Sequence, residues 1–529
     1  MKPGYPAVLM FLPLAFNVLA VSAQAFFELE NSLINYSIAE LAPARTCNEL
    51  NQFTTEEIVR LSARNIPADE PAPAFCQVTG VLAPEIAFEI SLPVLWNGRF
   101  YMFGNGGHAG EALDNPGRVA QRNLALQHGF AVAQTNTGHY ASEEPGASFV
   151  MSNPQKAIDY AWRAVHLTAL TAKALINDYY SKPIDYSYWN SCSNGGRQGL
   201  IEAQRYPDDF DGVVANAPWL DQTGFTIGAM WNQRSMVEVE IPAARLELLA
   251  DRVMAKCDVI DGLEDGLIDD PRQCDFDPAR DVPSCGDEPG DDCLTLDQAR
   301  AIANVYNGPV SNGETIFPGF ERGSEQVMGL FGGGTGSGWL NLIVSIRPGV
   351  KPADFNLAEN TMRYLVHNPP MPDYDYQTFD FDRDTFMLDA WSEQADARDP
   401  DLSAFRQRGG KLLMTYGWAD AVLQPRVGVD YYEEAHSVNG TDTPDFFRLF
   451  MIPGMGHCAG GYGPDQHDPM TAIINWVEKD VAPEALTARR IVDGEVVRSR
   501  PLCPYPQVAR YVGQGSIDDA ANFACEVPH

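Results

Sequence analysis

The sequence predicts an α/β fold in which a mostly parallel sheet is covered by helices and interrupted by one large insertion. Three observations support this prediction. Strand patterns alternate with helical patterns over residues 85–218 and again after residue 400. A serine, Ser193, lies in a glycine-rich turn between a strand pattern and a helical pattern. Between residues 219 and 400 the alternation is lost, so this stretch is unlike the rest of the chain.

The first part of the chain supplies several strands and one long helix. Apolar and β-branched residues predict strands at 86–94, 100–103 and 129–135. Alanine and leucine at helical spacing predict a helix over about 154–180. A short aromatic strand at 185–189 then leads directly into the serine turn.

The remaining elements repeat the same order of strand and helix. After the serine turn we expect a helix at 199–205 and then a strand at 212–218. Beyond residue 410 the pattern resumes with strands at 411–416 and 446–452 and a final helix at 469–479. Strands that alternate with helices in this way form parallel sheets, because each connection must cross the sheet. We therefore expect an α/β domain built from residues 26–218 and 401–529.

Residues 219–400 predict an inserted lid domain over the carboxyl edge of that sheet. The stretch holds four of the ten cysteines, many Asp and Gly residues, and a flexible glycine run at 332–338. No internal repeat is evident. No motif in this stretch indicates a substrate.

The N-terminus predicts export. Lys2 is followed by an apolar run over 7–21 and then by Ala23-Gln24-Ala25, which is typical of a signal peptide cleaved after residue 25. The alternative is an uncleaved anchor, although the apolar run is short for a membrane span. We expect a secreted or periplasmic protein with no membrane contact after cleavage. The sequence makes no prediction of oligomeric state.

The net charge of the chain limits the classes of macromolecule that it could bind. The chain carries 71 acidic and 37 basic residues, a formal net charge of −34. Such an excess of negative charge disfavours nucleic acid and anionic membranes as partners, since both are polyanions.

The ten cysteines predict disulfides, because an even number is typical of exported proteins. Their spacing suggests four local pairs and leaves two cysteines for each other: Cys47–Cys76, Cys257–Cys274, Cys285–Cys293, Cys503–Cys525, and Cys192–Cys458. The last pair flanks Ser193 and His457, so a bridge there would hold the two residues close together. A structural zinc site is the alternative, but no C-x-x-C occurs.

Ser193 is the candidate nucleophile. Its surroundings, Ser191-Cys192-Ser193-Asn194-Gly195, approximate the Gly-x-Ser-x-Gly turn, in which small neighbours allow a sharp strand-to-helix elbow. The alternative is an ordinary Ser-Gly turn. Its position between strand and helix favours an elbow, and with it an α/β-hydrolase fold with a large inserted lid domain.

Backbone N–H groups near the elbow could bind an oxyanion. Asn194 follows the serine on the N-terminal side of the predicted helix, where backbone N–H groups can bind an oxyanion. The turn at 104–107 follows an early strand, where this fold presents its second donor, so Gly106 or Gly107 is a candidate. A plain hairpin turn is the alternative.

Asp420 and His457 complete a candidate triad. Asp420 follows the strand at 411–416, and His457 lies in a glycine-rich loop after the strand at 446–452. The order Ser, Asp, His along the chain is the order used by this fold. For Asp420 the alternative is a helix cap or a turn.

An acidic loop in the insertion predicts a calcium-binding site. Carboxylates mixed with glycine turns offer the oxygen ligands that calcium prefers, although the spacing is not that of an EF-hand. The candidate ligands are three side chains and two backbone carbonyls: Asp258, Asp261 and Asp265, with Leu263 and Leu267. The alternative is a solvated acidic loop. A bound calcium would stiffen the lid, and we expect no organic cofactor.

Several of these motifs together resemble the tannase and feruloyl esterase family, which includes mono(2-hydroxyethyl) terephthalate hydrolase. The similar segments span nearly the whole chain: 104–107, 192–198, 379–382, 417–420, 456–458 and 500–506. The resemblance implies the Ser193–Asp420–His457 triad, the Cys192–Cys458 bridge and a calcium-binding lid. One departure is Ser191, where the family usually has glycine.

Taken together, we predict a secreted serine esterase. By resemblance, its substrate is a small or polysaccharide-linked ester of an aromatic acid, such as a hydroxycinnamate, a gallate or a terephthalate half-ester. The alternatives are an esterase for acetyl or other non-aromatic esters, a calcium-dependent binding protein without activity, and an acyltransferase that uses the same acyl-enzyme.

Overall fold

A computed structural model describes residues 31–36, 41–70, 72–286, 290–326, 338–345 and 349–528. The predicted signal peptide, residues 1–25, lies outside the described residues, as does most of the glycine run at 332–338.

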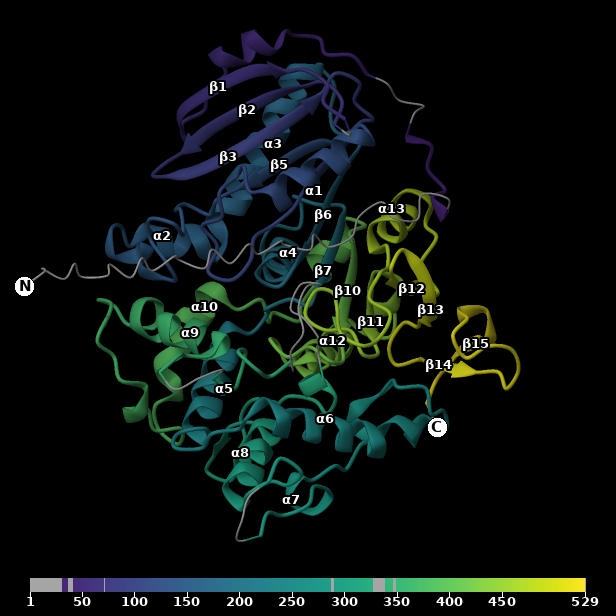
Figure 1. Cartoon of the computed structure of the whole chain (residues 1–529). Coiled ribbons are helices and arrows are strands. Elements are labelled where there is room, and N and C mark those ends of the chain that lie inside the picture. Colours follow the sequence, from purple (N-terminus) through teal and green to yellow (C-terminus); the bar gives the residue numbers. More distant parts are fainter. Residues whose placement is uncertain are drawn as a thin grey trace, which may run out of the picture.

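A nine-stranded sheet organises the described residues (Figure 1). Its spatial order is β1-β2-β3-β5-β4-β6-β7-β10-β11. The strands span Ile58–Ile66 (β1), Phe75–Leu82 (β2), Ile86–Pro93 (β3), Arg99–Met102 (β4), Ala131–Thr135 (β5), Tyr186–Cys192 (β6), Gly212–Asn216 (β7), Lys411–Gly417 (β10) and Phe447–Ile452 (β11).

The half of the sheet from β5 to β11 is parallel, and the other half is antiparallel. The pairings β5-β4, β4-β6, β6-β7, β7-β10 and β10-β11 are parallel. β1, β2 and β3 form an antiparallel meander that joins β5. The predicted α/β-hydrolase fold is confirmed, and the sheet is mixed.

Helices cover both faces of the parallel half. On one face lie α3 (Ala164–Tyr180), α4 (Asn194–Arg205) and α12 (Pro425–Asn439), and on the other lie α1 (Pro116–Gln127) and α13 (Pro469–Lys479). Alternate residues of one strand enter the two cores: Phe100 of β4 packs with the first group of helices and Tyr101 with the second. Strands buried on both faces are apolar along their whole length, which explains why the sequence pattern identified them.

Two helices differ from their predictions. The helix predicted over 154–180 is divided into α2 (Gln155–Ile158), a π-helical turn (Asp159–Arg163) and α3. The helix predicted to begin at residue 199 begins at Asn194, directly after the serine. Glycines at 195 and 196 lower helix propensity, and packing against the sheet overrides that preference.

The segment between β7 and β10 adds no strand to the large sheet within its described residues. It forms α5 (Gln222–Ser235), α6 (Ala243–Cys257), α7 (Pro278–Asp281), α8 (Leu296–Asn307), the short hairpin Val310–Ser311 (β8) and Glu314–Thr315 (β9), α9 (Ala353–Asn360) and α10 (Asp389–Ala395). α6, α7 and α8 lie in the lower part of Figure 1, where α6 and α8 pack around one apolar core, whereas α5, α9 and α10 share a core with Tyr160 and Tyr416. The prediction that this insertion is a lid stays a prediction.

The two ends of the insertion meet. Ala397 N–H donates to the Leu220 carbonyl over 2.8 Å. The Asp396 carboxylate accepts the N–H of Gln222 over 2.8 Å and the hydroxyl of Ser392 over 2.7 Å. The chain therefore leaves the sheet and returns to it through one stem.

All ten cysteines form disulfides in the five predicted pairs. None remains to bind zinc as a thiolate, so the zinc alternative is wrong. Beyond α13, the hairpins β12–β13 (Leu486–Val492, Glu495–Leu502) and β14–β15 (Val508–Tyr511, Phe523–Glu526) lie beside the sheet. Among the described residues, none of the helices combines the length and apolar character needed to cross a bilayer.

Candidate active site

The candidate catalytic residues lie at one edge of the sheet. Gly104–Gly107 follow β4, Ser193 follows β6, Asp420 follows β10 and His457 follows β11. These strands run parallel and side by side, so their carboxyl ends open at the same edge. That edge is where open α/β sheets bind ligands.

Ser193 has an unusual backbone conformation, with φ 62° and ψ −126°. Three hydrogen bonds hold it in place. Its N–H donates to the Asn216 carbonyl over 3.0 Å, and its carbonyl accepts the N–H groups of Trp219 over 2.9 Å and Arg197 over 3.1 Å. The side chain is half-buried at the start of α4. This geometry matches a nucleophile elbow.

The elbow requires glycine on its helical side. A Cβ on Gly195 would lie 2.0 Å from the Ser191 hydroxyl oxygen, and one on Gly196 would lie 2.8 Å from the Asn216 carbonyl oxygen. Ser191 itself is buried, so a side chain is accommodated at the position where the resemblance leads one to expect glycine.

A disulfide links the elbow to the histidine loop. Cys192 and Cys458 are bonded with their Cα atoms 5.9 Å apart, across 266 residues of sequence. Each cysteine is the immediate neighbour of a candidate catalytic residue. Because the bridge fixes the separation of the two loops, it also limits how far Ser193 and His457 can move apart.

Asp420 orients His457. The imidazole Nδ1 lies 2.8 Å from an Asp420 carboxylate oxygen, and both side chains are buried. The other carboxylate oxygen accepts the N–H groups of Val422 over 2.8 Å and Leu423 over 2.9 Å. With Nδ1 directed at a carboxylate, the imidazole carries its proton there and keeps Nε2 as a base.

The loop that carries Asp420 and the loop that carries His457 also contact one another through their backbones. Trp418 N–H donates to the Ile452 carbonyl over 2.9 Å, and Ala419 N–H donates to the Met455 carbonyl over 3.0 Å. A Cβ on Gly417 would lie 2.2 Å from the Met455 carbonyl oxygen, so this approach needs glycine.

The glycine turn lies against the elbow. A Cβ on Gly104 would lie 2.7 Å from the Gly195 Cα. Within the described part of the chain, no acceptor is found for the N–H groups of Gly106, Gly107 or Asn194. Asn194 is the first residue of α4, where unpaired N–H groups are expected. All three candidates are therefore able to donate to a ligand.

His108, next to the turn, is a second imidazole close to this site. Its Nε2 lies 3.0 Å from the Thr361 hydroxyl, and burial lowers the pKa of His108 to about 3. The ring is thus neutral at ordinary pH. Since Thr361 belongs to the insertion, this contact also joins the insertion to the glycine turn.

Sequence reasoning missed the polar side chains behind the glycine turn. The Tyr160 hydroxyl lies 3.0 Å from the Gly107 carbonyl oxygen and 3.2 Å from the Asn194 Oδ1. Arg197, fully buried, donates from Nε to the same Asn194 oxygen over 2.7 Å. Arg197 belongs to a segment that supported the resemblance, whereas nothing in the sequence distinguishes Tyr160 from other core tyrosines.

The acidic loop of the insertion folds around its own carboxylates. Asp258 accepts the N–H groups of Asp265, Gly266 and Leu267 at 3.0–3.2 Å. Asp261 accepts the N–H of Leu263 over 2.9 Å.

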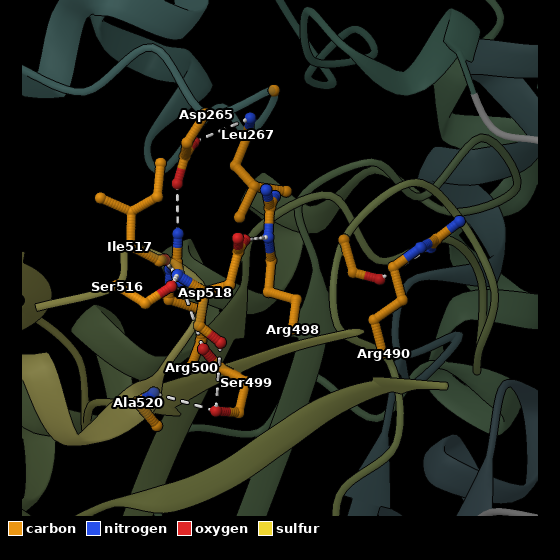
Figure 2. A network of polar contacts seen from close by, with 12 residues as sticks. Asp265, Leu267, Arg490, Arg498, Ser499, Arg500, Ser516, Ile517, Asp518 and Ala520 are labelled. Atoms are coloured by element: carbon orange, nitrogen blue, oxygen red, sulfur yellow. Dashed lines mark hydrogen bonds and ion pairs between the residues drawn. The ribbon is translucent and has the colours of Figure 1, made fainter. Parts of the chain in front are cut away.

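Asp265 is tied to the C-terminal hairpins (Figure 2). Its carboxylate pairs with the Arg500 guanidinium, and both side chains are almost wholly buried. Arg500 also donates to the Ile517 carbonyl, while Arg498 pairs with Asp518 over 2.7 Å. Arg510 Nη1 donates to the Asp261 carbonyl over 3.1 Å. The hairpins therefore enclose the acidic loop.

Several carboxylates lie close to one another in the acidic loop. Burial and the neighbouring carboxylates raise the pKa values of Asp261 and Asp269, and Arg500 is the cation paired with this cluster. Asp269 was not among the predicted ligands, although it lies in the same acidic run. Asp265 is already paired with Arg500, so calcium binding by this loop stays a prediction.

Comparisons with known proteins agree with this geometry. The sequence matches the family model described as tannase and feruloyl esterase over residues 72–526. It is 32% identical over 515 residues to mono(2-hydroxyethyl) terephthalate hydrolase of Piscinibacter sakaiensis, covering 86% of this chain and 85% of that protein. It is 34% identical over 540 residues to an uncharacterized esterase of Xanthomonas campestris pv. campestris, covering 90% and 91%.

Solved structures agree as well. The crystal structure of feruloyl esterase B from Aspergillus oryzae superposes with a TM-score of 0.77 at 26% identity, covering 90% of this chain and 98% of that chain. Tannin acyl hydrolase from Aspergillus niger has a TM-score of 0.69 at 21% identity, covering 93% and 95%, and so shares the fold.

Removing the Cys192–Cys458 bridge tests its role. We expect the double variant Cys192→Ala/Cys458→Ala to lose stability by about 2–4 kcal/mol, as is usual for a native disulfide. We also expect lower kcat on any ester that the parent hydrolyses, because the elbow and the histidine loop are no longer tied. Chemical denaturation and initial rates measure the two effects.

The matched control is Cys285→Ala/Cys293→Ala, which removes a bridge that spans only 8 residues within the insertion. It should leave kcat unchanged. Full activity in the Cys192/Cys458 variant would contradict the positioning role of that bridge.

Proposed function

The chain belongs to the tannase and feruloyl esterase family and is a carboxylic ester hydrolase, and we propose that it cleaves esters of aromatic acids through Ser193, His457 and Asp420. One observation carries the proposal. Ser193 lies on a strained elbow whose Cys192 is bonded to Cys458, beside a His457 that is already directed by Asp420.

In the first half of the reaction, His457 Nε2 takes the proton of the Ser193 hydroxyl while Oγ attacks the ester carbonyl carbon. The carbonyl electrons move to oxygen and form a tetrahedral oxyanion. When that intermediate collapses, the bond to the alcohol oxygen breaks and the imidazolium returns its proton to the leaving alcohol. The acid remains bonded to Ser193 as an acyl-enzyme.

In the second half, water replaces the alcohol. His457 takes a proton from water, hydroxide attacks the acyl carbon, and collapse releases the carboxylic acid and restores the Ser193 hydroxyl. Asp420 stabilises the imidazolium in both halves and keeps the productive tautomer.

Two backbone N–H groups would bind the oxyanion, those of Asn194 and Gly107. The Gly106 carbonyl accepts the N–H of Ala109 over 2.8 Å. A trans peptide points its C=O and N–H in opposite directions, so the N–H of Gly107 faces away from that bond. Neither donor has a protein acceptor in the described part of the chain, which supports assigning them to substrate.

The aromatic acyl group is proposed from the relatives and from the insertion. The names of similar proteins specify terephthalate and ferulate esters. Leu357 of α9 lies beside the glycine turn, and the Trp219 ring centroid is 5.6 Å from that of His108. Apolar side chains of the insertion therefore lie beside the glycine turn, which supports an apolar acyl group there.

We also propose a structural calcium ion held by Asp258, Asp261 and Asp265 with the carbonyls of Leu263 and Leu267. When bound, the ion would neutralise the crowded carboxylates of the insertion. Export, as the N-terminal sequence predicts, is consistent with the five disulfides.

Hydrolysis of methyl ferulate, methyl gallate and mono(2-hydroxyethyl) terephthalate tests the proposed substrate class. We expect turnover of at least one of them and none in Ser193→Ala. Asp420→Asn should lower kcat by roughly 10³–10⁴-fold, because the imidazole loses its orienting charge. Folded protein that cleaves acetyl esters but none of the three would sink the aromatic assignment and support a non-aromatic esterase.

Removal of calcium tests whether the acidic loop binds this ion. Dialysis against EDTA should lower Tm, and calcium should restore it, because a ligand that binds only the folded state stabilises that state. Asp261→Asn should abolish the calcium-dependent part of Tm. Glu264→Gln is the matched control, since Glu264 is exposed in the same loop and is not a proposed ligand. An identical calcium response in both variants would exclude this site.

A further inference from the structure

Tyr160 lies behind both proposed oxyanion donors. Its ring is fully buried, and its hydroxyl is the meeting point of three polar groups. The Gly107 carbonyl oxygen is 3.0 Å away, the Asn194 Oδ1 is 3.2 Å away, and the Gln222 Nε2 is 2.6 Å away. One side chain thus touches the glycine turn, the first residue of α4 and the first residue of α5.

The donors that surround the Tyr160 hydroxyl set the direction of its hydrogen bonds. Gln222 Nε2 donates to the Tyr160 oxygen. Arg197 has only donors, so the Asn194 atom that receives its Nε–H at 2.7 Å must be the amide oxygen. The single proton of the Tyr160 hydroxyl then goes to its nearest acceptor, the Gly107 carbonyl. Burial raises the pKa of Tyr160, so the hydroxyl keeps that proton at ordinary pH.

These contacts control the direction of the Gly107 N–H. The peptide that carries this N–H is held by Ala109, whose own N–H bonds the Gly106 carbonyl over 2.8 Å. The following peptide is held by Tyr160 at the Gly107 carbonyl. Gly107 itself has φ +44°, a conformation that glycine leaves easily unless both neighbouring peptides are fixed.

The helix that carries Tyr160 departs from α geometry at this residue. Residues Asp159–Arg163 form a π-helical turn between α2 and α3. Such turns are rare and occur frequently at functional sites. Here the turn presents Tyr160 between the elbow and the insertion, with the Arg197 guanidinium 5.1 Å from its ring centroid.

We propose that Tyr160 is a positioning residue that aligns the oxyanion donors at Gly107 and Asn194, and that Gln222 couples this alignment to the stem of the insertion. The inference rests on the proposed function. Through Gln222, whose N–H is held by Asp396, a displacement of the insertion stem would reach the oxyanion site.

Tyr160→Phe tests this role, because it removes the hydroxyl and keeps the ring. Removal of a whole oxyanion donor lowers kcat by about 10²–10³-fold, so a misdirected donor should lower it by roughly 10–100-fold, with KM within about twofold. Affinity for a phenylboronic acid, which forms a tetrahedral adduct with the serine oxygen, should fall in parallel with kcat. Substrates are the three aromatic esters and 4-nitrophenyl acetate.

The matched control is Tyr180→Phe. Tyr180 lies at the end of α3, is buried, and donates its hydroxyl to the Pro93 carbonyl over 2.6 Å. The Tyr180→Phe variant therefore loses a comparable buried hydrogen bond at a position away from the site. Both variants should lose similar amounts of Tm, and only Tyr160→Phe should lose kcat and boronate affinity.

The outcomes are distinguishable. If the parent enzyme cleaves none of the esters, the proposed function fails. If the parent is active and Tyr160→Phe keeps kcat and boronate affinity, or loses no more of them than Tyr180→Phe, the positioning role is overturned. Should Tyr160→Phe not fold, Gln222→Met decides: a lower kcat at unchanged KM supports the coupling, and an unchanged kcat overturns it.

Discussion

The backbone of Ser193 is the constraint on which the site depends. Its φ of 62° and ψ of −126° lie in a region that costs non-glycine residues of order 1–3 kcal/mol. That cost is offset by three contacts: with the Asn216 carbonyl at the end of β7, with the α4 backbone, and, through the disulfide, with the loop after β11. The elbow therefore depends on β7, α4 and the histidine loop being in place together.

The same assembly brings the other groups to the serine. β4, β6, β10 and β11 end at one edge, so a nucleophile, two sets of backbone donors, a carboxylate and an imidazole converge from distant parts of the sequence. Glycines at 104, 195 and 417 permit the close backbone approaches. The Cys192–Cys458 bridge adds a covalent limit where hydrogen bonds alone would allow the histidine loop to shift.

The sequence was sufficient for most of the buried strands, although not for β2, and it identified the candidate catalytic residues that the structure brings to one edge of the sheet. β3, β10, β11 and α13 were predicted almost to the residue, because strands buried on both faces and a strongly amphipathic helix carry clear patterns. β1 was not predicted, since it is an edge strand with mostly exposed residues and a weak pattern. The π-helical turn was not predicted either, because its composition is that of an ordinary helix.

What the sequence could not supply was mutual placement. Tyr160 and Gln222 are separated by 62 residues, and only the packed structure shows that they meet. Asp269 lies in an acidic run that was recognised, but its position beside Asp261 depends on how the loop folds under the C-terminal hairpins. Residue type and spacing predict candidates, while three-dimensional contact decides which of them act together.

The joined stem of the insertion has an evolutionary and a practical consequence. The backbones of Leu220 and Ala397 are hydrogen-bonded to each other, so the two ends of the insertion lie side by side. At the sheet, the chain therefore has the geometry of a short closed loop, independent of the length of the insertion. Chain-closure entropy rises only by about 0.6 kcal/mol for each doubling of loop length, so such a segment can grow, shrink or be replaced at small cost. The insertion also contacts the rest of the chain outside the stem, through Asp265–Arg500 and Gln222–Tyr160. A relative's segment grafted between residues 220 and 397 would therefore need these contacts as well as the stem, and such a graft would test whether the insertion sets specificity.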